Sequence, residues 1–185
     1  MLKRTLLLVA VALVSIGLLT GCGGDSLKGK DLLRDKAALK KMTEEMKTKG
    51  GTPLMLFQHV NIDSDFINFT RQDQKKPENV DNFIWHAERG WQGPKAVKLK
   101  GDGKLEDNLY NFDEVNWDAI PDFVANAEKK AKEEGIEKAK IDGIMVYFNV
   151  RDQKLSFSGT IKGERKDASV SGDIKTGEIT YFKVR

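Results

Sequence analysis

The chain has 185 residues, of which 39% are hydrophobic and 32% are charged, with one cysteine and two histidines. This composition suits one domain or two small ones and excludes a largely disordered chain. A single cysteine excludes an intramolecular disulfide framework and a zinc site built from several cysteines. The 31 basic and 28 acidic residues become 29 and 28 without Lys3 and Arg4, so the charge gives no reason to expect nucleic-acid binding.

The N-terminus has the pattern of a targeting segment. Lys3 and Arg4 precede a run of 15 residues, 5–19, that contains no charge. A membrane span needs about 20 apolar residues, whereas the hydrophobic region of a signal peptide is shorter. Residues 19–22 then read Leu-Thr-Gly-Cys. This arrangement resembles the lipobox of bacterial lipoproteins.

The lipobox resemblance implies a processed and lipidated protein. Residues 1–21 would form the signal peptide, and Cys22 would be acylated on its sulfur and amine and would anchor the chain to a membrane. Gly23 and Gly24 imply sorting to the outer membrane, facing the periplasm or the surface, in a host with two membranes. The alternatives are a secreted protein or an uncleaved anchor with a chance cysteine. Residues 22–30 are predicted to be a flexible tether.

Two segments of the mature chain have helical spacing. In the first, residues 31–49, apolar side chains such as Leu32 and Met42 recur on one face, and Gly50 and Gly51 end the pattern. The second, residues 117–134, repeats this design and ends at Gly135. Its N-cap is predicted to be Asp118, with Pro121 in the first turn.

Strand-like segments follow each helix. We expect strands over 54–62, 66–71, 82–88 and 96–99, and again over 144–150, 155–163, 168–174 and 178–184. Residues 62–75 and 141–154 share six of 14 positions when aligned without gaps. We therefore predict a duplicated helix-plus-sheet unit, over residues 31–100 and 117–185, with a connecting loop over 101–116.

A helix followed by several strands, occurring twice, predicts an α+β fold with each helix on one face of an antiparallel sheet. Residues 168–179, Ala-Ser-Val-Ser-Gly-Asp-Ile-Lys-Thr-Gly-Glu-Ile, resemble the closing hairpin of PepSY-like domains. The tandem arrangement also resembles, in outline, the β-lactamase inhibitory protein. Neither resemblance carries a functional residue over to this chain.

The sequence shows no catalytic set and no metal-ligand spacing, so we expect no cofactor and no metal. Cys22 is assigned to the anchor, and His59 and His86 are expected to be half-exposed strand residues. The alternative for the histidines is a metal site shared with nearby carboxylates, which no ligand spacing supports.

Aromatic and arginine side chains are the remaining binding candidates. Trp85, Arg89 and Trp91 have a composition that is enriched at binding hot spots, although both tryptophans have a structural alternative, packing on the first helix or closing a hairpin. Tyr110 is expected at the seam between the units, either in the core or in a groove. Tyr147 would face a ligand if the outer face of the second sheet is open.

These observations predict a membrane-anchored, non-enzymatic binding or accessory protein of the bacterial cell envelope. Its partner would be a protein, a peptide or a cell-wall component, bound at the open sheet face or at the seam. An inhibitor of an envelope enzyme is one specific form of this function. The alternatives are an enzyme with an unrecognised carboxylate pair, for example one acting on glycans, and a structural assembly factor.

Overall fold

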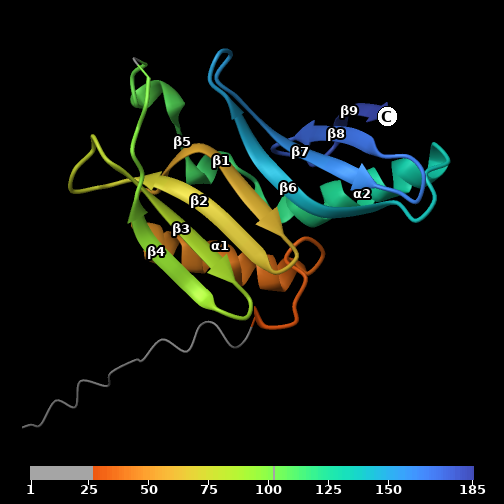
Figure 1. Ribbon diagram of the computed structural model, residues 1–185, viewed down its shortest axis with the longest axis horizontal. Helices are drawn as coiled ribbons and strands as arrows, with labels where there is room; N and C mark the ends of the chain where they lie inside the picture. Colours follow the sequence, from red (N-terminus) through yellow and green to blue (C-terminus); the bar gives the residue numbers. More distant parts are fainter. Residues whose placement is uncertain (1–26, 102) are drawn as a thin grey trace, which may run out of the picture.

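The computed structural model describes residues 27–101 and 103–185. These residues form two α-helices and one nine-stranded antiparallel sheet, which confirms the predicted α+β class (Figure 1). Within the described residues, neither helix has the length and apolar character needed to cross a membrane.

The helix and strand order is the same in the two halves of the chain. The first half contains α1 (Lys36–Gly50), β1 (Met55–Asp63), β2 (Phe66–Gln72), β3 (Val80–His86) and β4 (Gly90–Ala96). The second contains α2 (Ile120–Glu133), β6 (Lys140–Asn149), β7 (Lys154–Lys162), β8 (Ala168–Asp173) and β9 (Ile179–Val184). A shared origin of the halves stays a prediction.

The two halves form one continuous sheet, because β1 pairs with β6 in the antiparallel direction. The strand order is β4-β3-β2-β1-β6-β7-β8-β9, and Val60 of β1 lies opposite Val146 of β6. Each half therefore places its first strand at the centre of the sheet. The outer edges are formed by β4 and β9.

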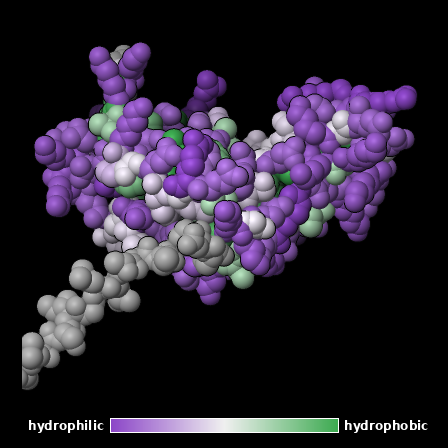
Figure 2. Space-filling model, turned by 60° about the horizontal axis from the view of Figure 1, so that its bottom comes forward, coloured by the Kyte–Doolittle hydropathy of each residue, from purple (hydrophilic) through white to green (hydrophobic). Residues whose placement is uncertain are grey.

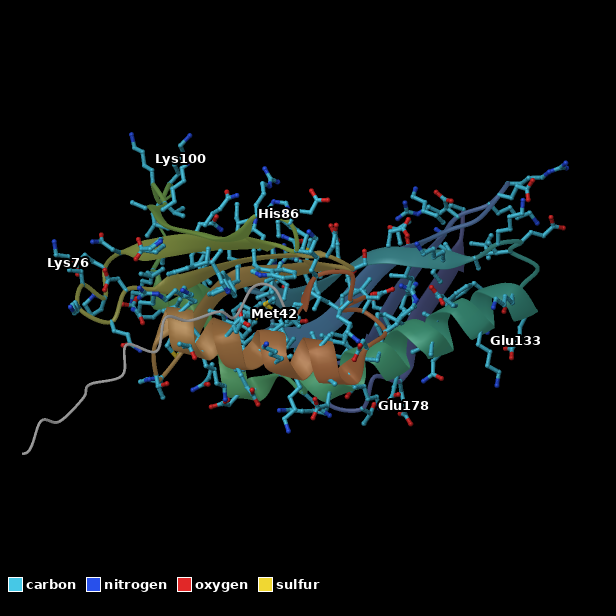
Figure 3. All side chains as sticks on the ribbon, turned by 90° about the horizontal axis from the view of Figure 1, so that it is seen from below. Met42, Lys76, His86, Lys100, Glu133 and Glu178 are labelled. Carbon is cyan, nitrogen blue, oxygen red and sulfur yellow. The ribbon has the colours of Figure 1, made fainter. Side chains whose placement is uncertain are left out.

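Both helices lie on the same side of the sheet, where they cover the hydrophobic core (Figure 3). Met42 of α1 points toward the sheet, whereas His86 lies on the side without helices. The largest fully buried side chains include an aromatic set drawn from both halves of the sheet and from α2: Phe69, Trp85, Phe123 and Phe157. This burial supplies the main driving force for folding.

The first helix begins later than the spacing predicts. The Asp35 carboxylate caps it by accepting hydrogen bonds from the backbone N–H groups of Ala37 and Ala38. Residues 31–34 instead form a turn, in which Leu32 is buried. The helix ends where the glycine pair predicts, with Gly51 at a φ of 82°.

The second helix is preceded by a 3₁₀ turn, Trp117–Ala119, which corrects the predicted cap. Asp118 lies inside this turn, and Ala119 takes the N-cap position without a side-chain hydrogen bond. Pro121 is in the first helical turn, as expected. Gly135 follows the helix at a φ of 74°.

Three predicted segments differ from the structure. The strand expected over 96–99 is β4, which ends at Ala96. The loop expected over 101–116 contains a further strand, β5 (Leu109–Asn111), which pairs with β1, and two 3₁₀ turns, Glu106–Asn108 and Phe112–Glu114. The predicted tether ends before Lys30, because Leu27 is only 1% exposed and belongs to the core.

Candidate functional site

The side of the sheet without helices, called here the helix-free face, carries a row of side chains across five strands. Asn61, Met145, Ser158, Ser171 and Tyr181 are successive cross-strand partners from β1 to β9. Each is at least partly exposed, and for Asn61, Met145 and Ser171 both strand neighbours on the other face are buried. Side chains alternate between the faces of a strand, so the same strands build both the core and this row.

A hollow of about 610 Å³ lies on the helix-free face and is called here the groove. It extends over β1, β6, β7, β8 and β9, from Asn61 and Asp63 to Tyr181 and Arg185. Its lining includes the hydroxyl-bearing residues Ser158, Thr160, Ser169 and Ser171.

Gly143 shapes the groove at its β1 side. A Cβ atom at this position would collide with the Asp63 carboxylate, which lies directly over the glycine backbone. The absence of a side chain therefore gives Asp63 its place at the β1 side of the groove. Asp63 and Gly143 are also direct cross-strand partners.

The two sides of the groove differ in charge. On the β1 side, burial raises the pKa of Asp63, and the neighbouring carboxylates Asp65 and Asp142 raise it further. On the β9 side the groove is lined by Arg185, and Lys162 lines it from β7, between the two sides. The Lys162 ammonium forms a salt bridge of 2.6 Å with Asp167.

A second hollow, of about 430 Å³, lies on the same face beside a stacked pair of rings. His59 and Tyr147 have centroids 5.0 Å apart and an angle of 17° between their planes. Gln58, before the histidine, has a φ of 58° where the pairing of β1 with β2 is irregular. Burial lowers the pKa of His59, which favours the neutral form of its imidazole.

The structure divides the predicted binding residues into two groups. Tyr147 is 38% exposed on the helix-free face, as the prediction of an open face requires. Trp85 and Tyr110 are 0% and 2% exposed, so both belong to the core and cannot contact a partner on the surface. This corrects their assignment. Tyr110 does lie at the seam, where its ring packs 5.3 Å from that of Phe148.

Trp91 and Arg89 lie away from the groove, on β4 and the turn before it. Trp91 is half-buried, and its Nε1–H donates a 2.8 Å hydrogen bond to Glu45 of α1. Arg89 is exposed, and its Nη2 lies 2.8 Å from Nε2 of His86. The predicted residues therefore do not gather at one site.

The sequence prediction missed several groove residues, namely Ser158, Ser171, Tyr181 and Arg185. For the two serines the sequence did indicate exposure, since strand alternation places them on the solvent side of the sheet. Their position beside Asn61 and Asp63 depends on the pairing of β1 with β6, which local patterns do not contain.

Polar chemistry dominates the described surface. Figure 2 shows a mostly hydrophilic side of the molecule, and large exposed hydrophobic side chains are few among the described residues. The described residues contain no group of three or more metal-binding side chains. Within the groove, Asp142 is exposed and salt-bridged to Lys140, so Asp63 and Asp142 are not a buried carboxyl pair.

No family model matches the sequence, so the PepSY-like resemblance of residues 168–179 stays a prediction. The chain is 28% identical over 162 residues to the protein named "Probable lipoprotein EnvF" of Salmonella typhimurium strain LT2. The match covers 82% of this chain and 61% of that relative, so the chain spans about three fifths of its length.

The fold is similar to a crystal structure described as a "putative lipoprotein (CD1622)" from Clostridium difficile 630. The TM-score is 0.58 at 10% identity, covering 88% of this chain and 99% of that one. This likeness supports the fold alone. Both proteins are named as lipoproteins, which agrees with the class that the N-terminal sequence predicts.

Proposed function

We propose that the protein is a lipoprotein of the bacterial cell envelope that binds an envelope partner through the helix-free face of its sheet. Cleavage before Cys22 and acylation of that residue would hold the folded domain at a membrane. The lipobox pattern and the names of the two similar proteins support the anchoring part of the proposal.

The open groove is the observation that carries the binding part. One wet face is common in antiparallel sheets and is not a site by itself. Here the face is also hollowed to about 610 Å³ and is lined by charged, hydroxyl and amide groups from five strands. A concave surface with convergent polar groups is the usual setting for ligand recognition.

The anchor can be tested by replacing the cysteine. Cys22→Ala in the full-length chain should leave the protein unprocessed or release it from the membrane fraction, with a mass that lacks acyl chains. Thr20→Ser keeps a small residue before the cleavage point and should be processed like the parent. An unchanged mass and membrane association of Cys22→Ala would refute the lipidation proposal.

Outer-membrane sorting is a finer proposal that applies to a host with two membranes. Gly23 and Gly24 lack the aspartate that favours retention in the inner membrane of such hosts. Gly23→Asp should therefore move the protein to the inner-membrane fraction, as measured by density-gradient separation. Gly23→Ser should leave it in the outer-membrane fraction.

The binding face can be tested by site-specific photo-crosslinking in cells. A photoreactive amino acid at Ser158 should form a discrete adduct with an envelope component, because Ser158 lines the groove. The same group at Lys129, an exposed position of α2, is the matched control and should give no such adduct. Equal labelling at both positions, or none at Ser158, would contradict binding by the helix-free face.

A further inference from the structure

The groove has an unpaired charge of opposite sign at each side. Within the described residues, Asp63 on β1 forms no salt bridge, whereas its neighbour Asp142 is paired with Lys140. The Arg185 guanidinium, beyond the end of β9, also forms no salt bridge there; the Asp167 carboxylate, which it attracts only at longer range, is bound by Lys162. A carboxylate and a guanidinium that face one hollow without partners can each accept a charged group from a ligand.

Uncharged hydrogen-bonding groups occupy the floor between these two charges. Thr160 and Ser169 are cross-strand partners, as are Ser158 and Ser171, and all four line the groove. The Ser169 hydroxyl is buried and has no hydrogen-bond partner among the described residues. Such a buried hydroxyl costs free energy until a ligand group satisfies it.

We propose, resting on the proposed function, that the groove binds a short extended peptide with unblocked ends. Its terminal ammonium would pair with Asp63, its terminal carboxylate with Arg185, and its amides with the hydroxyl groups between them. A neutral glycan would leave both charges unpaired. A peptide with free ends supplies one group of each sign.

The width of the groove sets the length of the peptide. From β1 to β9 the strand order crosses four strand-to-strand spacings. At about 4.8 Å each, these give roughly 19 Å, and an extended chain advances about 3.4 Å per residue. A peptide of about five residues therefore spans the two charges.

The test is calorimetric titration of the intact mature protein, held in detergent, with penta-alanine in three forms. The peptide with free ends should bind tightest, and N-acetylation or C-amidation should each weaken binding at least fivefold. Asp63→Asn should abolish the difference made by acetylation, and Arg185→Gln the difference made by amidation. Lys129→Gln, on the outside of α2, is the control and should leave all three affinities unchanged.

Equal affinity for the three peptides, no binding, or tighter binding of chitotetraose would overturn the proposal. Crosslinking at Ser158 distinguishes failure of the peptide proposal from failure of the proposed envelope-binding function. An adduct at Ser158 without peptide binding leaves an envelope-binding face with another ligand. If neither an adduct at Ser158 nor peptide binding is observed, the helix-free face is not a binding surface.

Discussion

The two faces of the sheet are built from the same strands but differ in chemistry. In β7, Phe157 is 0% exposed under α2, and the next residue, Ser158, lines the groove on the other face. In β8, Val170 and Ser171 repeat this contrast. The comparison indicates that stability depends on one set of alternating positions and recognition on the other, so substitutions should separate the two.

The largest expected effect is at the buried member of the β7 pair. Phe157→Ala removes a ring that packs 5.5 Å from that of Phe123, and should lower the free energy of unfolding by about 3–5 kcal/mol. Ser158→Ala, the matched change on the other face, should alter it by less than about 0.5 kcal/mol. Urea denaturation measures both, and similar losses for the two variants would remove the distinction between the faces.

A smaller loss is expected at a polar link between the halves. The Glu128 carboxylate of α2 accepts hydrogen bonds from the Arg34 guanidinium and from the backbone N–H of Ile141, the latter at 2.9 Å. Glu128→Gln removes the negative charge that pairs with the half-buried Arg34 guanidinium. It should lower the free energy of unfolding by about 2 kcal/mol.

The control for the Glu128 variant is an exposed ion pair on the same helix. Lys130 and Glu134 form a 3.0 Å salt bridge at the surface. Lys130→Gln should therefore change stability by less than about 0.5 kcal/mol. If Glu128→Gln is as mild as Lys130→Gln in urea denaturation, the link does not stabilise the joined sheet.

Trp91 tests whether a predicted binding residue has a structural role instead. Trp91→Phe keeps the ring against Phe69 but removes the hydrogen bond to Glu45, and should cost about 1 kcal/mol. Crosslinking through Ser158 should be unchanged. Loss of that crosslink with unaltered unfolding free energy would instead assign Trp91 to partner binding.

Local patterns were sufficient to predict most of the fold. Helical spacing and the Gly51 and Gly135 stops located both helices, and strand alternation located the second-half strands to within a few residues. The prediction failed at β4, where Gly93 and Pro94 interrupt the alternation that marks a strand. The strand was therefore expected at the alternating residues 96–99.

The candidate site was less accessible from the sequence than the fold. Tyr147 was identified because alternation places it opposite the buried Val146. The groove itself requires β1 and β6 to be neighbours, although they are far apart in the sequence and no turn joins them. That long-range pairing brings Asp63 to the same hollow as Ser169 and Arg185.

The smallest change in stability is expected at Asp63, and it tests the contrast between the two faces of the sheet most directly. Its pKa is raised in the folded protein, first by burial and then by Asp65 and Asp142. A carboxyl with a raised folded pKa favours folding most below its unfolded pKa, and this contribution is lost as pH rises through the folded pKa. At neutral pH the charged Asp63 therefore opposes folding.

Asp63→Asn should therefore raise the urea midpoint at pH 7, and this gain should shrink toward zero as the pH falls below the ordinary aspartate pKa. Asp152→Asn is the control, because Asp152 is exposed in the turn between β6 and β7 and is not among the carboxylates that shift Asp63, and it should give no gain. If Asp63→Asn is more stable and binds acetylated and free penta-alanine equally well, the native Asp63 lowers the stability of the fold but is needed for peptide recognition. If Asp63→Asn is instead less stable at pH 7, Asp63 is a structural residue, and side chains on both faces of the sheet then stabilise the fold.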